Sequence, residues 1–163
     1  MGKVSTYETI EQKVRAVAEQ EAFGKWNYIY DGWYTINERM SSERLPAILN
    51  ILPSSGKLRI GNTQITDIGD CVIAFCDRCD FDFDGQDTDL SVVERLKRCA
   101  DAFIVALNRS GYFKPISDEV IYSVMFDHLD VNVAVVAIQV TLEEQAGIPV
   151  CGTTTIDSIL DYE

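Results

Sequence analysis

The stretch that decides the fold runs over residues 70–107, D-CVIAFC-DRCDFDFDGQDTD-LSVVERLKRCADAFIVAL. Residues 71–76 are short and apolar, as expected for a buried strand, and residues 77–89 follow as an acidic loop. The apolar positions of residues 90–107 include Val92, Leu96, Cys99, Phe103 and Leu107. Their spacing of four, three, four and four residues is that of one helix face. This strand–loop–helix order predicts a domain that contains both helices and strands.

The residues before this stretch begin with another amphipathic pattern. Ser5 and Glu8 have the spacing of a capping box, which predicts the start of a first helix. Its apolar stripe is Ile10, Val14, Val17 and Ala18. Gly24 is suited to a left-handed residue that ends the helix. Residues 26–30 then alternate aromatic with other side chains, and this period of two predicts a strand.

Short elements are predicted between that strand and the central stretch. Residues 33–40 have the spacing of a short helix, and residues 45–52 have the composition of a strand. Pro46 fits only the edge of a sheet or the start of a strand, because proline has no backbone N–H to donate. Residues 53–56, Pro-Ser-Ser-Gly, predict a turn, and Gly61-Asn62 predicts a tight hairpin turn.

Two strands are predicted after the long helix. Residues 120–126 and 131–142 are the strands, and residues 127–130 connect them as a hairpin loop. The second strand is apolar on both of its faces. Either it lies in the centre of the sheet, covered on both sides, or part of it is buried in a partner subunit.

Together these elements predict an α+β fold with a mixed, mainly antiparallel sheet and two main helices packed on one face. A chain of 163 residues is long enough for one domain with its own core. We therefore expect a single domain over residues 1–163, with a core of about residues 7–143 and a surface tail over residues 144–163.

Composition and charge narrow the classes of function. With 14 basic and 26 acidic residues the net charge is −12, which repels phosphate backbones and argues against specific nucleic-acid binding. Such a charge would also suit a surface past which DNA slides without binding. No apolar run approaches the length of a membrane span, and residues 1–8 lack the apolar core of a signal peptide. The five cysteines are an odd number, so we expect reduced thiols in a cytosolic setting.

The acidic loop has features of a calcium site. Asp80, Asp82 and Asp84 alternate and are followed by Gly85, as in the opening of a calcium-binding loop. The position that should carry a bidentate glutamate is Ser91, and a strand rather than a helix precedes the loop. Two explanations stay open: a calcium site built on Asp80, Asp82 and Asp84, or a solvated acidic loop with no metal and no cofactor.

Other residues that could carry chemistry are few. Cys76 and Cys79 form a C-x-x-C pair, but zinc needs a second ligand pair at similar spacing and the sequence has none. Small core residues at a strand end are the alternative explanation. His128, the single histidine, lies between Asp127 and Asp130 in the hairpin loop, as in a solvated turn. No nucleophile with an oriented base and no phosphate loop is recognisable, so we expect no enzyme activity. A small cysteine-dependent enzyme is a further alternative.

The order of the predicted elements resembles that of the tail-terminator (tail-completion) proteins of long-tailed bacteriophages and related prophages. Four segments carry the resemblance: LPAILNILPSSG at residues 45–56, CVIAFC with the acidic segment after it from residue 71, FIVAL at residues 103–107, and YSVMFD at residues 122–127. The resemblance covers roughly residues 7–143.

The resemblance implies a structural protein of the virion, assembled in the cytoplasm of the host bacterium. It implies a homo-oligomeric ring, six-fold in the family, held by a heterologous interface that closes on itself. Such a ring would join the tail tube to the head, with the tail-tube and head-connector proteins as partners. It transfers no catalytic, cofactor or metal-binding residue to this sequence. The alternative function is a calcium-binding interaction module that uses residues 80–89.

Overall fold

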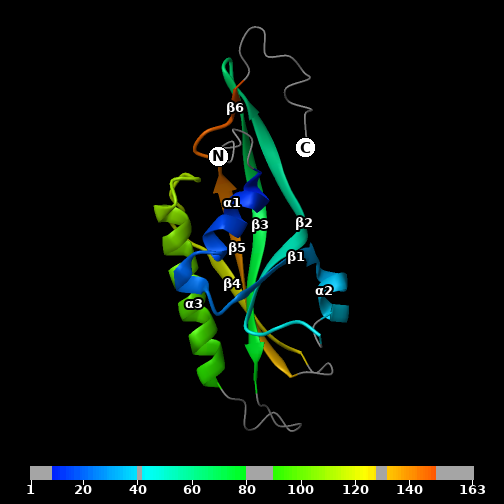
Figure 1. Ribbon diagram of the computed structural model, residues 1–163. Helices are drawn as coiled ribbons and strands as arrows, with labels where there is room; N and C mark the ends of the chain where they lie inside the picture. Colours follow the sequence, from blue (N-terminus) through cyan, green and yellow to red (C-terminus); the bar gives the residue numbers. More distant parts are fainter. Residues whose placement is uncertain (1–8, 40–41, 80–89, 128–131, 150–163) are drawn as a thin grey trace.

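The computed structural model describes residues 9–39, 42–79, 90–127 and 132–149 (Figure 1). Within these residues the helices are α1 (Ile10–Ala18), the short 3₁₀ turn η1 (Glu21–Phe23), α2 (Trp33–Arg39) and α3 (Leu90–Arg109). The strands are β1 (Asn27–Gly32), β2 (Ala47–Ile60), β3 (Gln64–Arg78), β4 (Ile121–Asp127), β5 (Val133–Glu143) and β6 (Ile148–Pro149).

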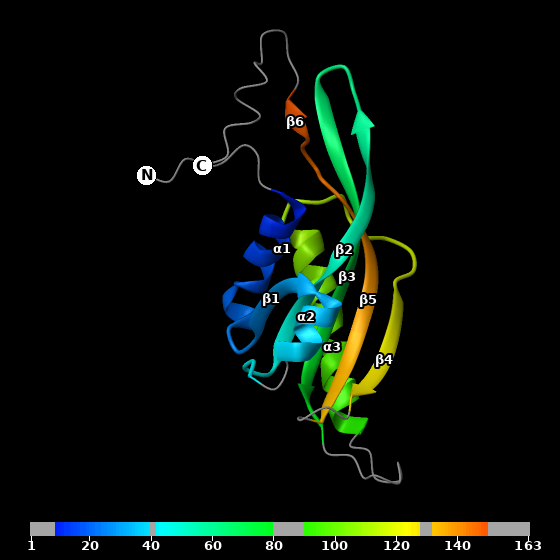
Figure 2. The same cartoon turned by 90° about the vertical axis from the view of Figure 1, so that its right-hand side faces the viewer.

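All the described strands belong to one sheet in the order β1-β2-β3-β5-β4, and β6 pairs with the beginning of β3. Only β1 and β2 run parallel, and the other pairs are antiparallel. Helices α1 and α3 pack on one face of the sheet, while α2 lies on the opposite face near β1 and β2 (Figure 2). The predicted α+β class, with its mixed and mainly antiparallel sheet, is confirmed.

The main core lies between the sheet and helices α1 and α3. Phe103 of α3 is fully buried and meets Phe23 and Phe75 edge-on, at centroid distances of 5.3 and 5.6 Å. The predicted apolar stripe of α3 is confirmed, because its members all point into this core. A smaller cluster on the other face joins Ile36 of α2 to Leu49 of β2 and neighbouring strand residues.

Strand β5 is central. It pairs with β3 from Ile68↔Glu143 to Arg78↔Val133, and with β4 on its other side. Alternate residues of β5 enter the two clusters, so that its stretch Val133–Ile138 is buried on both faces. Of the two explanations for its apolar character, the structure shows the central position within its own sheet.

The predicted turn at residues 53–56 is wrong, because β2 continues through it. A register shift between Ile51 and Ser55 absorbs the irregular residues, and pairing with β3 resumes at Ser55↔Asp70. A hairpin turn follows β2 as predicted, but the Gly61 N–H donates to the Gln64 carbonyl at 2.9 Å, which centres the turn on Asn62-Thr63, one residue later than the predicted Gly61-Asn62. The ends of β2 and β3 therefore form a hairpin that projects past the helices (Figure 1). We call residues 55–67 the arm.

The first helix begins at Ile10 rather than after Ser5. Thr9 is its extended N-cap: its hydroxyl accepts from the Gln12 N–H at 3.2 Å, and the Gln12 side chain accepts from the Thr9 N–H at 2.9 Å. This is a capping box, formed one turn later than the predicted one. Ser5 and Glu8 lie outside the described residues.

The predicted left-handed cap at Gly24 is also wrong. Helix α1 ends at Ala18, and Gly24 has a right-handed backbone with φ of −61° after η1. The intervening 3₁₀ turn carries Phe23 into the core against Phe103. Burial of the aromatic ring thus sets the backbone path here, and no left-handed residue is needed.

The chain stays part of the fold beyond β5. Glu144 is buried and forms an ion pair with Lys13 of α1, whose side chain is also buried. Gln145 donates its N–H to the Tyr112 carbonyl at 2.9 Å, and β6 then pairs with the arm. Burial and the nearby Glu144 carboxylate raise the pKa of Asp67, an effect that Lys13 partly offsets.

Replacing Lys13 with Met tests the buried ion pair. A carboxylate left buried without its partner is strongly unfavourable, so we expect the free energy of unfolding in urea to fall by about 3 kcal/mol. The matched control is Lys114→Met, whose exposed pair with Glu143 is worth about 1 kcal/mol or less. The double variant Lys13→Met/Glu144→Gln should recover most of the loss. Equal losses for Lys13→Met and Lys114→Met would contradict a structural role for the buried pair.

Candidate interaction surface

Strand β4 lies at the edge of the sheet and exposes apolar side chains on both of its faces. Its exposed large apolar residues are Ile121 (66%), Tyr122 (52%), Val124 (38%), Met125 (38%) and Phe126 (39%). Proteins usually protect an edge strand with charged residues, proline or a bulge, because its free N–H and C=O groups can pair with another chain. Residues 121–126 contain neither a charge nor a proline. This strand is therefore the best candidate interaction surface among the described residues.

The position of α3 explains why β4 is uncovered on one face. Tyr122 and Val124 pair with Ile138 and Val136, so their side chains lie on the α3 side of the sheet. A helix is about 10 Å wide and strands lie about 4.8 Å apart, so one helix covers about two strands. Helix α3 packs on β3 and β5, and it reaches β4 mainly where the Lys97 ammonium lies 4.8 Å from the centre of the Tyr122 ring.

The opposite face of β4 carries Ile121 and Met125. The described helix on this side is α2, which packs near β1, and β1 is the other edge of the sheet (Figure 2). Neither helical layer therefore covers β4. One of the two explanations that the sequence left open placed a partner contact on residues 131–142, whereas the structure exposes β4. The sequence does contain a signal for this surface. Strand β4 is apolar on both faces, and the single long helix α3 is too narrow to cover it as well as β3 and β5.

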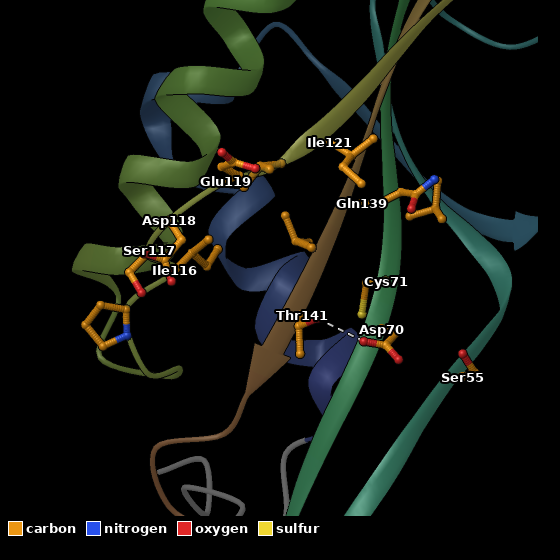
Figure 3. A pocket seen from close by; sticks show the side chains of 14 residues that line it. Ser55, Asp70, Cys71, Ile116, Ser117, Asp118, Glu119, Ile121, Gln139 and Thr141 are labelled. Carbon is orange, nitrogen blue, oxygen red and sulfur yellow. Dashed lines mark hydrogen bonds between the residues drawn. The ribbon is translucent and has the colours of Figure 1, made fainter.

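An open cleft of about 820 Å³ lies next to the start of β4 (Figure 3). Residues 115–121 line one side, with Asp118 and Glu119 among them, and the β3–β5 ladder lines the other. On the ladder the Thr141 hydroxyl donates to the Asp70 carboxylate at 2.9 Å. The polar groups in the figure lie on separate walls of the cleft and do not converge on one point.

Cys71 lines this cleft but is a poor nucleophile. Its side chain is buried, and burial raises the pKa of the thiol to about 11, with further raising by the carboxylates of Asp67 and Asp70. Burial likewise raises the pKa of the Cys99 thiol to about 12. The thiolate is the reactive form of cysteine, so both residues are held almost entirely in the unreactive form at neutral pH.

The C-x-x-C pair is divided between two cores. Cys76 is buried in the cluster on the α2 side of the sheet, and Cys79 is buried in the cluster under α1 and α3. Both side chains are in the thiol form. Because their side chains enter opposite faces, they do not form a ligand pair for one metal ion. The explanation as small core residues at a strand end agrees with this placement.

The remaining predicted site residues cannot be placed. Asp80, Asp82, Asp84 and His128 lie outside the described residues, so the calcium alternative stays a prediction. Within the described ranges, no group of three or more histidine, cysteine, aspartate or glutamate side chains could hold a metal ion.

Comparison with known proteins adds no relative: no protein-family model and no curated protein matches the chain. No helix in the described part of the chain is long and apolar enough to span a bilayer. The resemblance to tail-terminator proteins therefore has only the sequence segments given above as its basis. The structural feature that bears on function is the exposed strand β4.

The reactivity of the thiols gives a direct test of the described electrostatics. A pKa of about 11 in place of the ordinary 9.0 lowers the thiolate fraction of Cys71 at pH 8 by about 100-fold. We expect alkylation of Cys71 by iodoacetamide to be at least that much slower in the folded chain than in urea, and to accelerate as the pH rises towards 11. Site-resolved mass spectrometry measures each rate. If Cys71 in the folded protein reacts at pH 8 as fast as in the unfolded chain, the raised pKa is wrong. That result would favour the alternative function, a small cysteine-dependent enzyme.

Proposed function

We propose that this protein is a self-associating structural subunit that forms a ring at the end of a phage tail tube, as tail-terminator proteins do. The observation that carries the self-association is β4, an apolar edge strand left open by its own helices. The sequence resemblance supports the phage setting. On this proposal the tail-tube and head-connector proteins are the partners, and the ring is built in the host cytoplasm before it enters the virion.

The exposed apolar area of β4 is of the right size to contribute to assembly but not to drive it alone. Burying the exposed part of five large apolar side chains is worth roughly 4–7 kcal/mol. Association costs about 4–15 kcal/mol in lost translational and rotational freedom. A single strand contact is therefore marginal, whereas a closed ring gives every copy two contacts and closes only when all are made. This favours a heterologous ring over an isolated pair held by β4.

The net charge is consistent with a ring through which DNA passes. A charge of −12 on each copy gives a ring with a strongly negative field. Phosphate backbones are repelled by such a field, so DNA in the lumen would slide and not bind. On the proposal, the acidic composition keeps the channel clear while apolar strands hold the subunits together.

The proposal is tested by the native mass of the assembly. We expect wild-type protein to form an oligomer of about six copies in multi-angle light scattering, and to appear as rings in negative-stain micrographs. Val124→Lys places a charge on the edge strand, and we expect it to shift the protein to the monomer. Val105→Lys is the matched control: Val105 is also an exposed valine, on α3, and its substitution should leave the oligomer intact.

Two outcomes would contradict the proposal. Wild-type protein that stays monomeric over the whole accessible concentration range would remove self-association altogether. An oligomer that survives Val124→Lys but is lost with Val105→Lys would place the interface on α3 instead of β4.

A further inference from the structure

The sheet has a second open edge, on the side away from β4. Strand β1 pairs with β2 only from Ala47 to Leu52, and residues 55–60 of β2 continue into the arm beyond it. Among the described residues these six pair with β3 on one side and with no strand on the other. The arm projects from the body of the molecule (Figure 1). In the part of the chain that the structure describes, each copy therefore has an open strand segment on each edge of its sheet, residues 55–60 of β2 and residues 121–125 of β4.

The arm strand is apolar on one face and basic on the other. Leu58 and Ile60 are 63% and 72% exposed, and their partners in β3 are Asp67 and Ile65. These residues lie on the α1 side of the sheet, because an added Cβ at Gly69, in the same alternate set of β3, would lie 2.9 Å from the Ile10 side chain of α1. The intervening residues Lys57 and Arg59 point to the other side.

The arm is held in place by contacts at its base and along its β3 strand. Arg59 and Lys114 both form ion pairs with Glu143 at the end of β5. Strand β6 pairs with Gln64 and Ile65 on the side of β3 that faces away from β2. A strand that is already ordered loses less conformational entropy when it binds, which favours its use as a docking element.

Resting on the proposed function, we propose that β4 of one copy pairs antiparallel with residues 55–60 of β2 in the next copy. Successive strands β2, β3, β5 and β4 alternate in direction. A second copy placed in the same orientation beside β4 therefore presents its β2 antiparallel to that strand. The result is one sheet that continues from subunit to subunit, with a heterologous contact that uses both open edges.

The side chains of the two segments match in this arrangement. Because the two copies have the same orientation, the face of the sheet that carries α1 and α3 continues from one copy into the next. Tyr122 and Val124 of one copy therefore come beside Leu58 and Ile60 of the next. Apolar residues thus meet apolar residues across the new strand pair, which is the arrangement that stabilises sheets. A two-fold pairing of β4 with β4 would leave the arm strand of both copies open.

The charges also match. The exposed acidic residues Asp118 and Glu119 directly precede β4. In an antiparallel pair the start of β4 lies near the end of the arm strand, which carries Lys57 and Arg59 and no acidic residue. Residues 55–60 are thus a basic segment on a chain of net charge −12, and they meet an acidic segment of the neighbour. Arg59 already pairs with Glu143 of its own copy, so Lys57 is the cation of this segment that the charge match depends on.

Mixing two blocked variants tests the pairing. Val124→Lys leaves the arm intact, and Ile60→Lys leaves β4 intact. Each variant alone should be monomeric, whereas their mixture can form one complete contact and should give a species of twice the subunit mass and no larger one. Light scattering over a concentration series measures both. Mixtures of either variant with Val105→Lys are the control. Because Val105→Lys retains both β4 and the arm, it can bind a further copy, and these mixtures should give oligomers larger than the dimer in which a blocked variant ends the row of subunits.

The outcomes separate this inference from the proposed function. If wild-type protein assembles but the mixture of blocked variants stays monomeric even at millimolar concentration, where a weak single contact would still form, the strand pairing is wrong and self-association stands. If Ile60→Lys alone still assembles fully, the arm is not the partner of β4, as in a β4–β4 pair. If wild-type protein is monomeric, both proposals fall. Circular dichroism and thermal unfolding check that each variant is folded, and Met125→Lys with Leu58→Lys is a second pair for the same experiment.

Discussion

The ladder between β3 and β5 is the interaction on which the rest of the structure depends. It joins Ile68–Arg78 to Val133–Glu143 without a break. Its alternate side chains supply both clusters, with Phe75 and Val136 under α1 and α3, and Ala74 and Val135 on the other face. Among the described strands, β2 and β6 pair with β3, β4 pairs with β5, and β1 joins the sheet through β2. The described α-helices pack on one face or the other of this sheet. A substitution here would therefore disturb two cores at once.

The exposure of β4 follows from the same constraint. Because the ladder is central, the long helix α3 lies over β3 and β5, and the next strand outwards is beyond its width. The arm is exposed for a related reason, since β2 and β3 are longer than the helices that cover them and continue past their ends (Figure 1). The two surfaces proposed to bind each other are thus the two places where the strands extend past the helical layers.

Periodicity predicted those parts of the fold that depend on local pattern. The stripe that includes Leu96 and Phe103 identified α3, alternation identified β1, and the apolar runs at residues 120–126 and 131–142 identified β4 and β5. The turn predicted at residues 53–56 was wrong because pairing with β3 outweighs the turn preference of Pro-Ser-Ser-Gly. Capping at Thr9 was missed because Ser5 and Glu8 have the same spacing, and sequence spacing alone does not distinguish two possible caps.

The candidate surface could be predicted from the sequence only in part. The excess of apolar residues in the last two strands was visible, but which strand is central is a property of the whole sheet. Asp80, Asp82 and Asp84, which the sequence offered as possible calcium ligands, lie outside the described residues. The described cysteines, in contrast, are core residues, and Cys76 and Cys79 lie on opposite faces.

Hydrogen–deuterium exchange of the wild-type protein at two concentrations tests the central claim most directly. The account predicts that the alternate backbone amides of residues 121–127 that point away from β5 exchange slowly in concentrated, assembled protein and quickly after dilution, because another chain pairs with that edge only in the assembly. Amides in the β3–β5 ladder should be protected at both concentrations and serve as the internal reference. Equal exchange of residues 121–127 at both concentrations, in samples whose mass shows assembly and dissociation, would contradict the claim that the open edge of β4 is where the copies join.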